Sequence, residues 1–95
     1  MSIEMKKISI DDTADGGTID RFLMVDRADG LPVGGLDPFV QGDEIIAYQC
    51  VYWGDEEDAS KFQTRTVRKR DGETTEALIK RSWRTAYELT PNGYW

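Results

Sequence analysis

The sequence lacks residue types on which much enzyme chemistry depends. Its 95 residues include no histidine and a single cysteine, Cys50. Histidine is the most common general acid or base near neutral pH, so its absence removes many catalytic mechanisms. Without histidine or a second cysteine, a zinc or other transition-metal site is not expected either. We therefore expect a protein with no enzymatic activity and no cofactor.

Long apolar runs are missing as well. No stretch approaches the ~18 apolar residues that a membrane span needs, and no apolar segment of a secretory signal follows Lys6 and Lys7. A small secreted domain would normally carry several cysteines. We expect a cytoplasmic protein that does not contact membranes, folded as one compact domain over residues 1–95.

Charge, by contrast, is plentiful and unevenly distributed. The formal net charge is −6, from 18 acidic and 12 basic residues. Residues 1–58 hold 14 acids and 4 bases, whereas residues 59–95 hold 4 acids and 8 bases. Such opposed blocks indicate an acidic surface for a basic partner, a nucleic-acid contact, or two blocks that neutralise each other in the fold.

Hydrophobic patterning predicts four strands, at residues 5–10, 21–26, 44–53 and 62–70. The run 44–53 is apolar on both faces, which predicts an inner strand covered on both sides. A turn at Gly30 predicts a hairpin that returns through residues 31–33. Beyond it, Gly34, Gly35, Pro38 and Gly42 predict a loop or irregular edge until Asp43.

The C-terminal segment has helical spacing. Apolar residues of 75–89 fall on one half of a helical wheel, Thr74 or Thr75 is a suitable N-cap, and Pro91 prevents continuation. We predict an α+β fold, in which this helix packs on one face of a small antiparallel sheet of about four strands. The alternative is an all-β barrel in which the last segment forms strands. The predicted helix contacts are Leu78, Ile79, Trp83, Ala86 and Tyr87.

The acidic block provides the favoured candidate site. The run Asp55, Glu56, Glu57 and Asp58 is too highly charged to be buried unpaired, and it would steer a basic partner toward this surface. Tyr94 and Trp95 are candidate interface anchors unless they fold back onto the sheet. These features predict a small protein-binding module, an inhibitor or regulator of a partner with a basic, nucleic-acid-binding groove. The same acidic residues are equally consistent with a solvated rim that provides solubility and binds no partner.

The basic segment 61–84 provides an alternative from another class. A nucleic-acid-binding module would use Arg65, Lys69, Arg81 and Arg84 on phosphates, with Phe62 or Trp83 available for stacking on bases. The acidic block argues against this alternative, because domains that bind nucleic acid are usually basic overall.

Two further residue patterns concern calcium binding and nucleophilic chemistry. Asp11, Thr13, Asp15 and Gly16 match positions 1, 3, 5 and 6 of a calcium-binding EF-hand loop, but Phe22 stands where the twelfth-position glutamate is required. Calcium binding in the loop 11–20 is therefore only a minor alternative. Cys50 lies within an apolar strand, where burial raises the pKa of a thiol, so we expect a core cysteine and no nucleophile.

Overall fold

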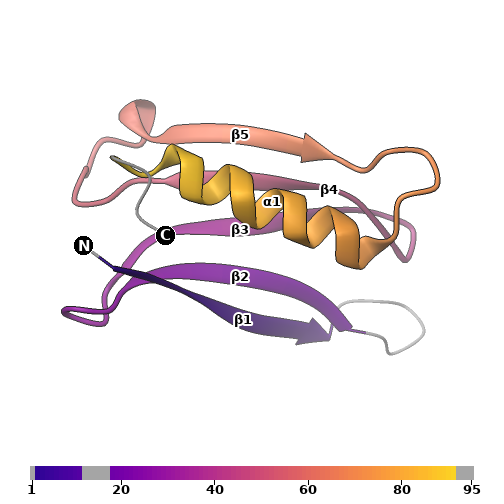
Figure 1. The fold of residues 1–95 in the computed structure, drawn as a ribbon, viewed down its shortest axis with the longest axis horizontal. Coiled ribbons are helices and arrows are strands. Elements are labelled where there is room, and N and C mark those ends of the chain that lie inside the picture. The colour runs from indigo at the N-terminus through magenta and orange to yellow at the C-terminus, as the bar shows by residue number, and fades with distance from the viewer. Residues whose placement is uncertain (1, 12–17, 92–95) are drawn as a thin grey trace.

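The strands of one sheet come first along the chain, and the helix follows them. The computed structural model describes residues 2–11 and 18–91, without the side chains of residues 9–11 and 18. Within this part, all strands form one antiparallel sheet in the order β1-β2-β3-β4-β5, each beside its sequence neighbour (Figure 1). The elements are β1 (Ile3–Asp11), β2 (Thr18–Asp26), β3 (Pro32–Gln41), β4 (Glu44–Tyr52), η1 (Ala59–Lys61), β5 (Gln63–Arg68) and α1 (Thr75–Leu89).

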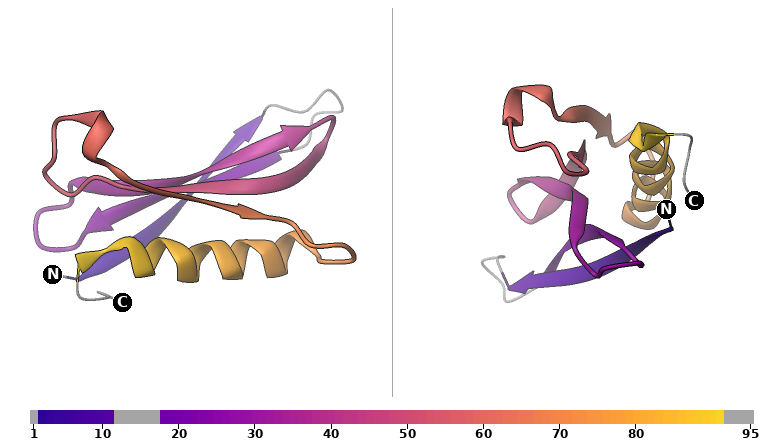
Figure 2. Two further views of the ribbon diagram at one scale, coloured as in Figure 1. Left: turned by 90° about the horizontal axis from the view of Figure 1, so that it is seen from above. Right: turned by 90° about the vertical axis from the view of Figure 1, so that its left-hand side faces the viewer.

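The predicted α+β class is confirmed, and the alternative barrel is wrong. The strand order leaves β1 and β5 as the two edges of an open sheet, and α1 lies against one of its faces (Figure 2). Helix α1 spans the predicted residues. Its first turn is closed by the Oγ1 of Thr74, which accepts a hydrogen bond from the Ala77 N–H at 3.1 Å. The Glu76 and Lys80 side chains pair at 3.7 Å across one turn of the helix.

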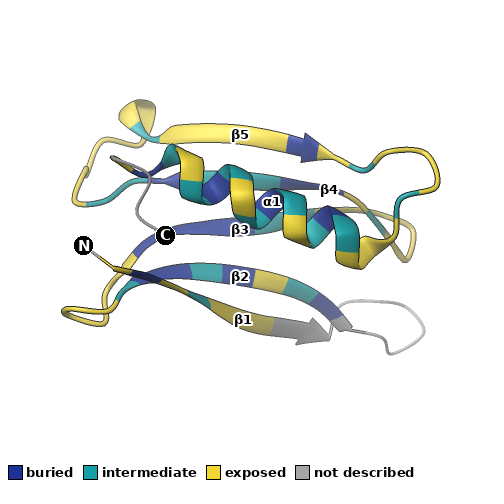
Figure 3. Ribbon diagram, viewed as in Figure 1, coloured by how far each residue is buried: buried dark blue, intermediate teal, exposed yellow. Residues whose placement is uncertain are grey.

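The core lies between α1 and the sheet. Leu78, Ser82 and Ala86 form the buried side of the helix, and Trp83 meets Phe22 of β2 edge to face at 5.3 Å. In Figure 3 the buried positions recur along α1 and along the strands behind it. The sheet contributes alternate residues of adjacent strands, which point toward the helix. Its fully or almost fully buried side chains include Phe22, Met24, Leu36, Tyr48 and Cys50.

The predicted hairpin strand at residues 31–33 continues through residues 34–41, where a loop or irregular edge was expected, and forms the middle strand, β3. Position 34 requires a glycine, because a Cβ there would lie 2.5 Å from the Val51 carbonyl oxygen, closer than Cβ atoms approach other atoms in proteins. Pro38 pairs with Tyr48 of β4 at a point beyond the register shared by β2 and β3, so its missing N–H removes no β2–β3 bond. The sheet therefore has five strands, where about four were predicted.

Strand β2 is also longer than predicted. It begins at Thr18, three residues before the expected start, and the side chain of Ile19 is buried. The Tyr48 hydroxyl donates a hydrogen bond to the Asp20 carbonyl at 2.8 Å, which fixes this extension across the sheet. Turn-forming residues precede this extension, so its local strand propensity is weak. Tertiary contacts outweigh that propensity in the fold.

Strand β4 is an inner strand, as predicted, but α1 covers only one of its faces. Tyr48 and Cys50 point toward the helix, whereas Ala47 and Val51 point to the opposite side. In Figure 2 that side carries no counterpart of α1, and only the loop that contains η1 lies over one end of it. We call it the open face. The expectation that both faces of this strand are covered is wrong, because the only α-helix of the described residues lies on the other face.

Candidate functional site

The predicted acidic residues form a structured loop between β4 and η1. Asp55, Glu56, Glu57 and Asp58 are all exposed, as expected, and we call them the acidic loop. The carboxylate of Asp58 caps η1 by accepting from the Ser60 N–H at 3.0 Å and the Ser60 hydroxyl at 2.7 Å. These bonds lower the pKa of Asp58, with the hydroxyl contributing most. The negative charge is thus held in a defined backbone conformation.

The start of the loop is fixed to the sheet by Trp53. Its backbone N–H and that of Gly54 both donate to the Val33 carbonyl, at 2.9 and 3.0 Å. Its indole Nε1–H donates to the Pro32 carbonyl at 3.2 Å, and its ring lies 5.8 Å from that of Phe62. Gly54 has a φ of 59°, which turns the chain away from β4 toward the acidic loop. The two aromatic rings therefore join both ends of the loop.

A shallow depression on the open face lies beside this aromatic pair. It has a volume of about 300 Å³, and we call it the aromatic hollow. The ion pair of Arg21 with Asp37, at 2.6 Å, neutralises the charges on its rim. Apolar side chains next to a charged loop are the usual composition of a protein-binding surface, with anchors inside and charge around them. The lining consists of Arg21, Phe22, Leu23, Gly35, Asp37, Val51, Trp53 and Phe62.

The acidic block is poorly compensated by the basic block. Among the six ion pairs of the described residues, only Lys69 with Glu44 joins residues 1–58 to residues 59–95. This contact lowers the pKa of Glu44, mainly through the hydrogen bond from Lys69. The other pairs form within one block. Mutual neutralisation of the two blocks through direct contacts is therefore slight, which leaves the acidic loop as an exposed concentration of charge.

The residues of the nucleic-acid alternative do not share one free surface. Arg65 approaches Glu88 at 3.9 Å and Lys69 pairs with Glu44, while Arg84 is exposed on α1. Arg81 is held most firmly, because its Nε and Nη2 both donate to the Glu73 carboxylate at 2.7 Å. This fork lowers the pKa of Glu73 to about 2, and the pKa of Arg81 is raised.

The two aromatic rings expected to stack on bases each contact another aromatic ring of the chain. Trp83 packs on Phe22 in the core, and Phe62 packs on Trp53. Trp83 is therefore held in the core by Phe22, whereas Phe62 lies at the surface beside Trp53.

Some predicted site residues lie outside the described part of the chain. Tyr94 and Trp95 are among them, as are the loop residues Thr13, Asp15 and Gly16 of the calcium alternative, and the side chain of Asp11 is not described either. Across residues 2–8 and 19–91, no three side chains of the metal-binding types gather around a possible ion.

Cys50 is the core residue that the sequence predicts. It is completely buried, and its thiol donates to the Ser82 carbonyl at 3.4 Å. Burial raises the pKa of this thiol to about 12. A thiol in this state is a poor nucleophile, because the thiolate is the reactive form.

The open face is the candidate surface that sequence reasoning missed. Its aromatic hollow depends on β2, β3 and β4 lying side by side, whereas the sequence predicts a loop at β3. Leu23 and Val51 alternate with core residues along their strands. This alternation was a signal in the sequence that could have placed both residues on the face opposite the helix.

No described helix is long and apolar enough to cross a membrane. No protein-family model, curated protein or solved structure matches this chain.

Proposed function

We propose that this chain is a non-enzymatic binding protein that inhibits or regulates another protein by docking its acidic loop onto a basic, nucleic-acid-binding groove. The observation that carries the proposal is the acidic loop itself, exposed yet held by hydrogen bonds and by the Trp53–Phe62 pair beside an apolar hollow. A preordered loop loses little conformational entropy on binding, so more of the contact energy appears as affinity.

The expected chemistry of the partner follows from the charges. Four carboxylates in one loop imitate a short run of phosphates, and they would speed the encounter with a lysine- and arginine-rich groove. The aromatic hollow would then receive an apolar side chain from the rim of that groove. The absence of catalysis in this proposal rests on the missing histidine and on the buried thiol of Cys50.

The test compares two variants of equal charge. Amides keep the size of the acids and one acceptor oxygen, and both capping bonds of Asp58 use a single oxygen, so these bonds can persist in both variants. Each raises the formal net charge from −6 to −2 by neutralising four carboxylates. The loop variant is Asp55→Asn, Glu56→Gln, Glu57→Gln and Asp58→Asn, and the matched control changes four exposed acids elsewhere, Glu4→Gln, Asp29→Asn, Asp43→Asn and Asp71→Asn.

The wild-type chain is used to capture its partner from nuclease-treated extract of the native cell, and the captured protein is purified for rate measurements. At low salt, the loop variant should associate about tenfold more slowly or worse, while the control changes the rate far less. If the association rate fell equally in both variants, the loop would act only through its contribution to the net charge, and the proposal would be overturned. A partner captured from untreated extract but not from nuclease-treated extract would favour the nucleic-acid alternative instead. Turnover of a substrate by the purified chain would also overturn the proposal.

A further inference from the structure

A second and larger hollow lies at the other end of the open face. It has a volume of about 590 Å³, and we call it the hairpin hollow because the ends of β3 and β4 enclose it. Ala47 at this end and Val51 at the aromatic hollow are four residues apart on β4, a separation of roughly 14 Å. The hairpin hollow is therefore distinct from the surface of the proposed function. It is lined by Phe39, Val40, Gln41, Ile46, Ala47, Thr66, Arg68 and Lys69.

Exposed apolar side chains concentrate around this hollow. Of the five exposed large hydrophobic residues described, Phe39, Val40 and Ile46 all lie here, between 38 and 45 % exposed. The register between β3 and β4 shifts after Phe39, so that Val40 pairs with Ile45 and Ile46 is the extra residue of a β-bulge. The bulge gathers apolar groups that a regular hairpin would distribute over two faces. A cluster of this kind, surrounded by polar groups, is typical of an interaction site.

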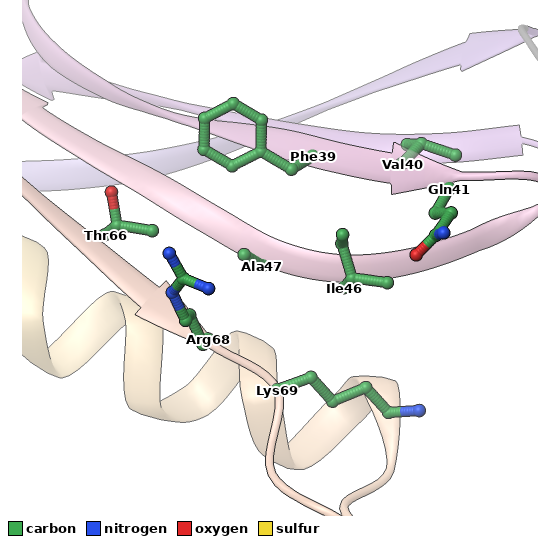
Figure 4. A pocket seen from close by; sticks show the side chains of 8 residues that line it. All are labelled: Phe39, Val40, Gln41, Ile46, Ala47, Thr66, Arg68 and Lys69. Atoms are coloured by element: carbon green, nitrogen blue, oxygen red, sulfur yellow. The ribbon is translucent and has the colours of Figure 1, made fainter.

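The charges that line the hollow are all positive. Arg68 and Lys69 are its charged residues, and no carboxylate lines it. Figure 4 shows Phe39 from β3 and Arg68 from β5 on either side of the β4 ribbon, with Lys69 extending away from Arg68. Lys69 is engaged by Glu44, whereas the guanidinium of Arg68 has no hydrogen bond or ion pair with any described residue.

The backbone beneath Arg68 is held rigidly. Its carbonyl accepts a hydrogen bond from the Nη2 of Arg81 at 2.6 Å, and Arg81 is itself fixed by the fork to Glu73. The next residue, Lys69, donates its N–H to the Ile46 carbonyl at 2.9 Å. The contacts of Arg81 and Glu73 thus fix the backbone from which the Arg68 side chain extends. Its guanidinium can bind an incoming carboxylate through two parallel hydrogen bonds.

We propose that the hairpin hollow binds a segment of a protein partner in which an aspartate or glutamate stands close to a large apolar side chain. The carboxylate pairs with Arg68, and the apolar side chain packs among Phe39, Val40 and Ile46. Charge complementarity selects this occupant, because no carboxylate lines the hollow and a basic segment would meet the unpaired guanidinium of Arg68. This surface does not depend on the acidic loop, so it can exist whether or not the proposed function holds.

The experiment uses a phage-displayed library of random linear dodecapeptides, selected on the immobilised full chain. Bound phage are then depleted on the Arg68→Glu variant, and enriched sequences are synthesised for affinity measurements. The matched control is Arg84→Glu, which makes the same charge change at an exposed arginine of α1. A second variant, Phe39→Ala, tests the apolar part of the hollow. Circular dichroism and sedimentation velocity establish the fold and the association state of each variant.

Enrichment of peptides that combine an acid with a neighbouring leucine or aromatic residue is the expected result. Their affinity should fall at least about tenfold in Arg68→Glu and severalfold in Phe39→Ala, and change less than about threefold in Arg84→Glu. Three outcomes would overturn the proposal: no enriched sequence, peptides that bind Arg68→Glu as well as the wild type, or a basic consensus. A dimer of the wild type that dissociates in Arg68→Glu would also overturn it, because the occupant would then be a second copy.

Discussion

Replacing Gly34 by alanine should destabilise the fold far more than the addition of one methyl group suggests. A Cβ at this position would lie 2.5 Å from the Val51 carbonyl oxygen and 2.9 Å from the Met24 sulfur. The sulfur belongs to a flexible side chain, but the carbonyl belongs to the backbone of β4, so β3 and β4 would have to separate. Overpacking of this kind costs about 1 to 3 kcal/mol, and the lower chain entropy of unfolded alanine returns about 0.4 to 1 kcal/mol.

Because two contacts fall below 3.0 Å, the cost lies at the upper end of that range, about 3 kcal/mol, and the net loss in the free energy of unfolding should be about 2 kcal/mol. For a domain of this size it corresponds to a fall in Tm of roughly 8 to 16 °C. Urea denaturation followed by tryptophan fluorescence measures the free energy, and thermal melting by circular dichroism measures the Tm. The same substitution at Gly35 is the control, because a Cβ there has a closest contact of 3.2 Å, with the Phe22 carbonyl oxygen.

Gly35→Ala should change the free energy of unfolding by less than about 1 kcal/mol, since the contact needs a shift of only a few tenths of an ångström. A Gly34→Ala protein as stable as wild type, or as the Gly35→Ala control, would refute the close approach of β3 and β4. The physical reason for a glycine at this position of a strand would be lost with it.

Three other predictions concern buried or paired groups. In the native protein, the Cys50 thiol should react with a disulfide reagent at pH 8 only as fast as the chain unfolds, because it is buried and its pKa is about 12; rapid labelling without denaturant would contradict its burial. The Glu73 carboxylate has a pKa of about 2 in the fold, below its ordinary 4.5, so its contribution to stability is present above pH 4.5 and is lost as the pH falls toward 2. Glu73→Gln should flatten this part of the stability profile measured by urea denaturation, and an unchanged acid slope would show that the fork to Arg81 is not populated. Tyr48→Phe removes the hydrogen bond to the Asp20 carbonyl and should cost about 1 kcal/mol, while ultraviolet titration of the wild type should show one tyrosine ionising near pH 12.

The helix and the strongest strand could be predicted because each has a local signal. The spacing of Leu78, Ser82 and Ala86 fits one side of a helix, and Thr74 supplies the cap. Strand β3 could not be predicted in this way. Its glycines are locally unfavourable in a strand, and only contact with Val51 across the sheet explains Gly34.

The candidate sites divide along the same line. The exposure of Asp55 to Asp58 follows from charge alone, and it could be predicted. The two hollows could not, because each depends on how neighbouring strands pair and on which side chains share a face, which no local pattern specifies. For the basic residues, the sequence predicted a site that the fold does not provide at Arg81. In the sequence Arg81 has the pattern of a free cation, yet in the fold it holds Glu73 and the Arg68 carbonyl.

By itself, the sequence determined the helix, the strand β4, the buried thiol and the excess of negative charge near residue 55, because each depends on residue type and short-range spacing. The tertiary structure decided which cations are neutralised, which face of the sheet stays open and where apolar groups gather on it. Those properties depend on pairing between strands, and the partner of a strand is set by the whole chain. A local pattern therefore locates the acidic loop, while only the assembled sheet creates the hollow beside it.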